Sequence, residues 1–182
     1  MRVLDLFSGI GGMSLGLESV GFKTIAFCES DEFCRRVLAR HWPDVTIHNS
    51  IEELDGRQYR GSVELVCGGF PCTPYSYSGL QRGAEDDRAL WPEMLRVISE
   101  ARPDWVLGEN VPGLKRLGLD SVLSDLESAT DEGYTSQAFD IGAIAVDAPH
   151  IRQRIFIVAR KNVADSDSER ACGWHSSGED AT

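Results

Sequence analysis

The chain opens with Arg2–Gly12, RVLDLFSGIGG, a short apolar run that ends in a glycine-rich turn. Helix-like spacing follows in Met13, Leu15, Leu17 and Val20. The pattern predicts a strand, a loop and a helix. Glycines after a first strand let the backbone turn tightly and approach a ligand, and the helix that follows presents free N–H groups. We therefore expect an α/β fold that binds a nucleotide-like ligand at this turn.

The same order repeats along the chain. Lys23–Cys28 predicts a second strand, and Phe33, Val37 and Leu38 then give one face of a helix. Further strands are expected at Val45–His48, Val63–Cys67, Trp105–Gly108, Ser136–Ile141 and Arg154–Ala159, and helices near Ala89–Ala101 and Leu119–Glu132. Alternating strands and helices predict a Rossmann-like α/β sandwich with a mostly parallel sheet.

Length and composition predict one domain and a tail. With 182 residues, 42% of them hydrophobic, the chain is long enough for one sizeable core. We expect the domain to span residues 1–160 and residues 161–182, rich in Ser, Gly and acid, to form a flexible tail. No apolar run approaches the roughly 20 residues of a membrane helix, and the N-terminus has no secretory signal pattern. We expect a cytoplasmic protein that contacts no membrane.

The net charge and the cysteine content argue against some classes of protein. The net charge of -11 is unusual for a protein that grips a polyanion, because Lys and Arg contacts to phosphate dominate nucleic-acid affinity. A local basic surface can still exist on an acidic molecule. The five cysteines are odd in number and have no CxxC spacing, so we expect neither a disulfide framework nor a metal site.

The first turn narrows the class of ligand. After Gly9-x-Gly11, Ser14 stands where the dinucleotide fingerprint has a third glycine, which disfavours NAD and FAD. Glu29 follows the second strand, where a carboxylate can accept both hydrogen bonds of a ribose diol. The alternative at this point is an ordinary helix turn with a solvated glutamate.

A cysteine and a glutamate follow two later strands. Cys72 lies in GGFPCTPYS, residues 68–76, bracketed by two prolines at the carboxyl edge of the sheet, where ligands bind in α/β folds. Cys67, within a strand, is expected to be a buried space-filler, and burial is also expected for Cys28 and Cys34. Glu109 follows the next strand, so a nucleophile and an acid are expected to face one pocket.

Two arginines precede the last strand. Arg152 and Arg154 are two residues apart and lie on one side of the strand if it has begun there. Both could meet an anionic or base-like ligand. Taken alone, such a pair is more often a surface salt-bridge partner.

In this order, Asp5–Gly12, Gly69–Cys72, Glu109–Val111 and Arg152–Arg154 resemble the DNA cytosine-C5 methyltransferases over about residues 1 to 160. The resemblance implies an enzyme, as in restriction-modification systems, that transfers a methyl group from S-adenosylmethionine to C5 of a cytosine flipped out of duplex DNA. It implies that Cys72 adds to C6, that Glu109 holds and protonates N3, and that Arg154, with Arg152 nearby, binds the base carbonyl.

The resemblance also implies a cofactor site. It places Phe7, Gly9, Gly11 and Gly12 around the methionine and adenosine, Glu29 on the ribose, and Pro71 and Leu90 along the adenine and sulfonium. The family commonly has an Asp before an Ile to read the adenine amino group, where this sequence has Ser50 and Ile51. Thr73 stands where many members have Gln.

Family enzymes continue into a target-recognition region and then return with a helix packed beside the first strand. We expect a second polypeptide to supply these parts. Two alternatives remain: a non-catalytic remnant that binds the cofactor or a protein partner, and a tRNA cytosine methyltransferase with the same chemistry on a splayed RNA base.

Overall fold

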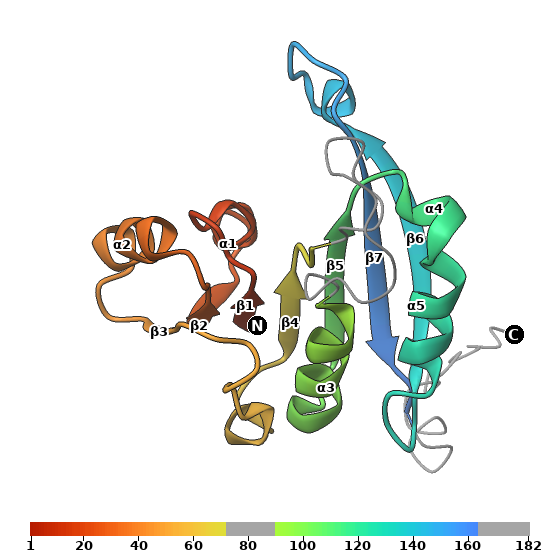
Figure 1. Ribbon diagram of the computed structural model, residues 1–182, viewed down its shortest axis with the longest axis horizontal. Helices are drawn as coiled ribbons and strands as arrows, with labels where there is room; N and C mark the ends of the chain where they lie inside the picture. Colours follow the sequence, from red (N-terminus) through yellow and green to blue (C-terminus); the bar gives the residue numbers. More distant parts are fainter. Residues whose placement is uncertain (72–89, 164–182) are drawn as a thin grey trace, which may run out of the picture.

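The structure, a computed structural model, describes residues 1–71 and 90–163. Seven strands form one sheet in the order β3-β2-β1-β4-β5-β7-β6 (Figure 1). The pairs among β1 to β5 are parallel, and β7 is antiparallel to both of its neighbours. This confirms the predicted α/β fold with a mostly parallel sheet. The strands are β1 Arg2–Leu6, β2 Lys23–Cys28, β3 Thr46–His48, β4 Leu65–Gly68, β5 Trp105–Asn110, β6 Tyr134–Gly142 and β7 Gln153–Lys161.

Helices cover the sheet unevenly. In Figure 1, α3 and α5 lie in front of the half of the sheet that runs from β4 to β6, while α1 and α2 lie beside β1, β2 and β3. The helices are α1 Gly12–Glu18, α2 Glu32–His41, α3 Trp91–Ala101, α4 Leu114–Leu117 and α5 Leu119–Glu127, with single 3-10 turns η1 Gly56–Tyr59 and η2 Ala143–Val146.

Two apolar clusters lie on opposite faces of the sheet. The larger packs Leu4, Leu6 and Val66 of the strands against residues of α3 such as Met94 and Ile98, all fully buried. The smaller consists of Val3, Leu65 and Cys67, with Met13 and Leu17 of α1 packed against it. Because α1 is short, this second face is covered over only part of its width.

The predicted apolar faces of α1 and α2 were partly wrong. Leu15, Val20 and Phe33 are 64%, 70% and 62% exposed. Met13 and Leu17 are four residues apart and share the face of α1 that meets the sheet, so Leu15 between them points away from it. A short helix can carry two overlapping sets of apolar residues, and their spacing alone does not show which set is buried.

The helix predicted near Leu119–Glu132 was also too long at its C-terminal end. The helix ends at Glu127, five residues before the expected end. At Gly133 the backbone has a φ of +64°, and a Cβ there would lie 2.1 Å from the Glu127 carbonyl oxygen. The chain therefore doubles back over the end of the helix before it enters β6.

Some expectations fall outside the described residues. The predicted tail lies almost wholly in residues 164–182, so the division into a domain of residues 1–160 and a tail stays a prediction. Within residues 1–71 and 90–163, none of the helices has the length and apolar character needed to cross a membrane. The same residues contain no cluster of His, Cys, Asp and Glu suited to a metal ion.

Candidate active site

The turn after β1 is fixed by a buried carboxyl group. Asp5 is 1% exposed and accepts a 2.6 Å hydrogen bond from the Ser14 hydroxyl of α1. Burial, opposed by this hydrogen bond, raises the pKa of Asp5 to about 6. The Ser8 hydroxyl donates to the Asp5 carbonyl oxygen at 2.6 Å. Between them Phe7 has a φ of +53°, a conformation that a non-glycine residue adopts only when its surroundings impose it.

The glycines of this turn have different roles. At Gly11 the φ is +87°, and a Cβ would lie 2.6 Å from the ring of Trp42, so packing requires a glycine there. A Cβ at Gly9 or Gly12 would meet no atom within 4 Å. The Gly9 amide instead donates a 2.6 Å hydrogen bond to the Glu29 carboxylate. The first turn is thus tied directly to the end of β2.

A cavity of about 290 Å³ lies at the carboxyl ends of β1, β2, β3 and β4. Its wall includes five of the residues predicted to bind the cofactor, whereas Gly9, Gly11, Gly12 and Ser50 are not part of it. The lining residues are Phe7, Cys28, Glu29, Ser30, Ile51, Glu52, Gly69, Pro71 and Leu90.

Glu29 is held in place on the cavity wall. Its two carboxylate oxygens accept hydrogen bonds from the backbone amides of Gly9, at 2.6 Å, and Asp31, at 2.7 Å. Beside it, burial raises the pKa of the Cys28 thiol to about 12, and the charges of Glu29 and Glu52 add to the effect. Cys28 is therefore a neutral thiol at physiological pH, as expected of a buried space-filling residue.

An acid and an arginine meet at the ends of β5 and β7. The Arg154 Nε lies 2.7 Å from Glu109 Oε1, and both side chains are about one quarter exposed. A Cβ at Gly69 would lie 3.0 Å from Glu109 Oε2, so the segment that follows β4 passes beside this carboxylate. The predicted acid and one of the two predicted arginines therefore share a site with the segment that leads toward Cys72.

Asn110 ties β5 to that segment. It is 4% exposed, and its side-chain amide donates a 3.0 Å hydrogen bond to the Phe70 carbonyl oxygen. Its own side-chain oxygen accepts from the Val111 amide at 2.8 Å. The residue after the acid thus positions the loop, a role that the sequence analysis did not assign to it.

The other two predicted catalytic residues are Cys72 and Arg152. Cys72 lies outside the described residues. Arg152 precedes β7, which begins at Gln153, and has a φ of +30° with an exposed side chain. The condition for Arg152 and Arg154 to share one side of a strand is therefore not met, because the strand has not begun at Arg152.

Sequence reasoning did not assign four residues of the cavity wall to the cofactor site, namely Cys28, Gly69 and the two polar residues Ser30 and Glu52. Ser30 and Glu52 directly follow Glu29 and Ile51, which were predicted. The Ser50 hydroxyl, which was predicted, donates a 2.5 Å hydrogen bond to the Glu52 carboxylate. A polar residue next to a predicted contact at a strand end is the signal that would have found them.

Comparison with known proteins identifies the family. The sequence profile described as C-5 cytosine-specific DNA methylase matches residues 1–175. The chain belongs to this family. It is 37% identical over 164 residues to the type II methyltransferase M.Eco47II of Escherichia coli, a match that covers 88% of this chain and 39% of that protein. It is 36% identical to the type II methyltransferase M2.BsuMI of Bacillus subtilis, with coverage of 87% and 42%.

Solved structures agree with the fold. A putative DNA modification methyltransferase encoded within an Escherichia coli prophage has a TM-score of 0.74 and 26% identity, over 91% of this chain and 49% of that chain. A Spodoptera frugiperda DNMT2 mutant has the same TM-score at 22% identity, over 90% and 51%, and shows the fold alone. The chain spans about two fifths of the length of the two type II methyltransferases and about half of the length of the two solved structures.

Proposed function

We propose that this chain transfers a methyl group from S-adenosylmethionine to C5 of cytosine in DNA through a covalent Cys72 adduct. The observation that carries the proposal is the pairing of Glu109 with Arg154 beside Gly69. Gly69 also lines the cavity, so a cofactor site and a base site would share one wall. In the sequence this wall continues through Pro71 into Cys72.

The cavity residues fit the methyl donor that enzymes of this family use. Each oxygen of Glu29 accepts one backbone hydrogen bond and keeps lone-pair capacity for a ribose hydroxyl. Phe7, Ile51 and Leu90 supply apolar wall for the adenine and the methionine side chain. When bound, S-adenosylmethionine would supply an electrophilic methyl group.

The remaining chemistry takes place on the base. C5 of cytosine is a poor nucleophile, so we assign the Cys72 thiolate to add to C6 while Glu109 holds N3 and a proton passes from Glu109 to N3. C5 would then take the methyl group as the bond between that methyl and the donor sulfur breaks, and C5 later loses its proton to a base. The bond between C6 and sulfur then breaks and N3 returns its proton to Glu109, which regenerates the Cys72 thiolate and restores the aromatic ring.

Arg154 would orient both the acid and the base. Its Nε contacts Glu109, and its Nη1 donates to the Gln153 carbonyl oxygen at 2.8 Å. Nη2 makes neither of these contacts, and we assign it to the base carbonyl. A planar guanidinium held by two fixed acceptors presents its remaining donor in one direction.

The experiment is transfer of labelled methyl from S-adenosylmethionine to mixed-sequence duplex DNA, with tRNA as a second substrate. We expect label in DNA cytosine that is lost in Cys72→Ser, while calorimetry finds cofactor affinity unchanged in that variant. Label in tRNA alone would replace the DNA proposal by the RNA one. Equal loss of cofactor binding in Cys72→Ser would contradict the assignment of the thiol to the base.

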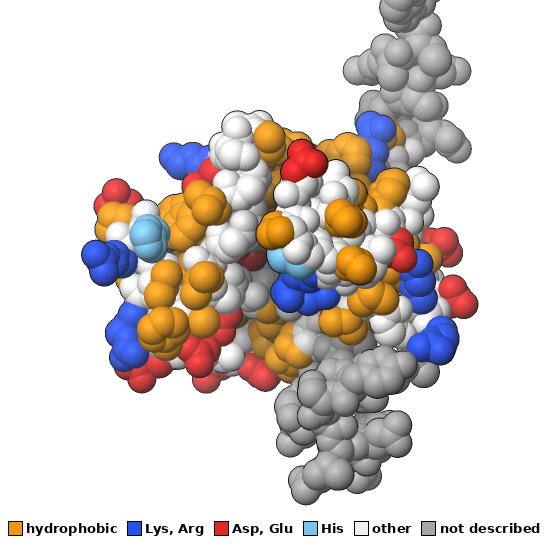
Figure 2. Space-filling view, turned by 90° about the horizontal axis from the view of Figure 1, so that it is seen from above, with side chains coloured by type: hydrophobic (Ala, Val, Ile, Leu, Met, Phe, Trp, Pro, Cys, Tyr) orange, Lys and Arg blue, Asp and Glu red, His pale blue; other side chains and the backbone are white. Residues whose placement is uncertain are grey.

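We also propose that a second, basic polypeptide supplies DNA recognition. The chain carries a net charge of -11, and on the face seen in Figure 2 the Lys and Arg side chains of the described residues are scattered rather than gathered. Phosphate contacts would then come mainly from the partner.

An apolar groove supports this proposal. It has a volume of about 290 Å³ and lies beside α1, on the sheet face that α3 and α5 do not cover. A hydrophobic patch of this kind is typical of a surface that another element covers. The groove is lined by Met1, Leu17, Phe22, Leu65, Trp105, Val106, Leu107 and Val158.

The partner can be tested with the part of M.Eco47II that lies beyond the region matched by this chain. We expect methylation of DNA to rise when that polypeptide is added, and Leu107→Glu to remove the rise while cofactor affinity stays the same. Full turnover by the chain alone, unchanged in Leu107→Glu, would overturn the need for a partner. Sedimentation of the chain alone tests whether a second copy covers the groove instead.

A further inference from the structure

The cavity runs along the edge of the sheet in a fixed order. Ile51 and Glu52 follow β3, Glu29 follows β2, Phe7 follows β1, and Gly69 follows β4. In the sheet these strands are neighbours in that same order, with β5 and its Glu109 beyond β4. One end of the cavity thus lies nearest the proposed base site, and Glu52 lies at the other end.

This order sets the direction of a bound cofactor, an argument that rests on the proposed function. The methyl group has to face the base, so the sulfonium lies toward β4 and Gly69. The ribose lies at Glu29, and the adenine then extends toward β3. The polar side chain of the cavity wall at that end is Glu52.

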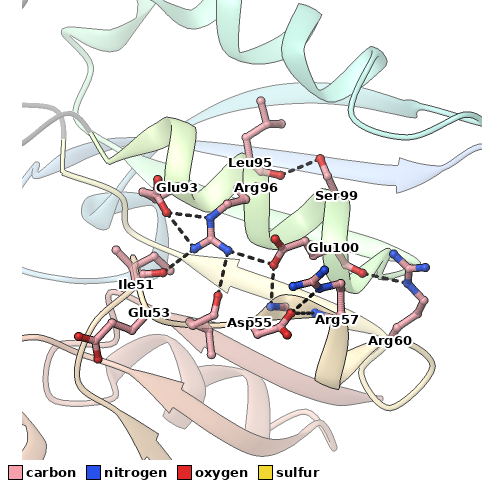
Figure 3. A network of polar contacts seen from close by, with 12 residues as sticks. Ile51, Glu53, Asp55, Arg57, Arg60, Glu93, Leu95, Arg96, Ser99 and Glu100 are labelled. Atoms are coloured by element: carbon pink, nitrogen blue, oxygen red, sulfur yellow. Dashed lines mark hydrogen bonds and ion pairs between the residues drawn. The ribbon is translucent and has the colours of Figure 1, made fainter.

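Glu52 is held from two sides. Its carboxylate accepts a 2.5 Å hydrogen bond from the Ser50 hydroxyl. The backbone of the preceding residue is fixed by Arg96 of α3, whose Nη2 donates to the Ile51 carbonyl oxygen at 2.6 Å. Figure 3 shows the Arg96 guanidinium between this carbonyl, Glu93 and Glu100. The carboxylate is therefore presented by a loop that is anchored to the helix beneath it.

We propose that the Glu52 carboxylate accepts a hydrogen bond from the exocyclic 6-amino group of adenine and makes the cavity selective for a 6-amino purine. The 6-amino group is the hydrogen-bond donor on that edge of the base, and a carboxylate is an acceptor only. A 6-oxo purine would place its oxygen against the carboxylate, so two acceptors would face each other. Ser50 serves as a positioning residue, because its hydroxyl proton is directed at Glu52.

The test is calorimetric binding of S-adenosylhomocysteine and of its 6-oxo analogue, S-inosylhomocysteine, to the purified full chain. We expect the wild type to prefer the 6-amino compound by about tenfold to a hundredfold, the range expected when one polar group loses its hydrogen-bond partner. In Glu52→Gln the side-chain amide can donate as well as accept, so this preference should fall by about tenfold or more.

Glu53→Gln is the matched control. Glu53 is the exposed neighbour in the sequence, carries the same charge and does not line the cavity. We expect it to keep the wild-type preference. Equal preference ratios in Glu52→Gln and the wild type would overturn the assignment of Glu52, even if both compounds bind more weakly.

The outcome also separates this inference from the proposed function. If the wild type binds S-adenosylhomocysteine and Glu29→Ala weakens that binding, the assignment of the cavity as the cofactor site holds. That result does not depend on the role of Glu52. If neither compound binds to the wild type, the proposed function fails first. Thermal unfolding of each variant ensures that a change in preference is compared between folded proteins.

Discussion

Replacing Arg96 by Met should destabilise the fold and loosen the loop that carries Glu52. The Arg96 side chain is 32% exposed and donates to two loop carbonyl oxygens, those of Ile51 at 2.6 Å and Leu54 at 2.9 Å. A hydrogen bond from a charged group contributes about 1.5 kcal/mol at the lower end of its range, so the two together contribute about 3 kcal/mol. The ion pairs with Glu93 and Glu100, whose side chains are about a quarter to a third exposed, add less than about 1 kcal/mol.

The assay is urea and thermal unfolding followed by circular dichroism at pH 7. For a chain of this size, 3 kcal/mol corresponds to a fall in Tm of roughly 6 to 12 °C. Met retains most of the apolar stem, so the change reports the lost polar contacts. Arg60→Met is the control, because Arg60 is exposed and its Nε donates only to the Glu100 carbonyl oxygen at 3.0 Å. A fall in the unfolding free energy or the Tm of Arg96→Met that is no larger than the fall in Arg60→Met would refute this prediction.

Three further predictions concern single carboxyl groups. Glu29→Ala should weaken S-adenosylhomocysteine binding by about 1 to 3 kcal/mol in calorimetry, because the ribose hydroxyls lose their acceptor; unchanged affinity would return Glu29 to a structural role. Glu109→Gln should lower methyl transfer by about a hundredfold or more while cofactor affinity stays constant, because the residue acts as an acid on the base and does not line the cavity; a parallel loss of affinity would argue against that role. The raised pKa of Asp5 favours folding below pH 3.8, and this contribution of about 3 kcal/mol is lost as the pH rises through about 6. Asp5→Asn should flatten the unfolding free energy against pH between 4 and 6, and an unchanged slope there would contradict the assignment; Glu64, whose pKa Arg2 lowers to about 2, titrates mostly below this window.

The sheet could be predicted from the sequence because each strand is a local apolar run. Lys23–Cys28 was predicted with the bounds that the structure has, and the other strands differ by one or two residues at one or both ends. Cys67 was expected to be buried and is fully so. Chain order also placed Glu109 at the correct edge, because the carboxyl ends of parallel strands meet there.

The features that could not be predicted from the sequence depend on contacts between distant parts of the chain. Arg96 meets Ile51 across 45 residues of sequence, and no local pattern in either segment predicts that meeting. Asn110 reaches the Phe70 carbonyl oxygen across 40 residues for the same reason. The exposure of Leu15 and Phe33 likewise depends on where the helix meets the sheet, which apolar spacing leaves open.

The apolar groove and the proposed base site lie on one face of the same two strands. Trp105, Leu107 and Glu109 alternate with buried residues along β5, so their side chains point to one side of the sheet. Leu107 pairs with Val158 and Glu109 pairs with Phe156 across the antiparallel contact to β7. A polypeptide that covers Leu107 would therefore lie within two residues of Glu109, about 7 Å along the strand. Its binding would remove water from around the pair of Glu109 and Arg154 and strengthen their interaction, because charges attract more strongly where water is excluded. If the proposed partner binds in the groove, it should therefore change the rate of methyl transfer as well as the affinity for DNA.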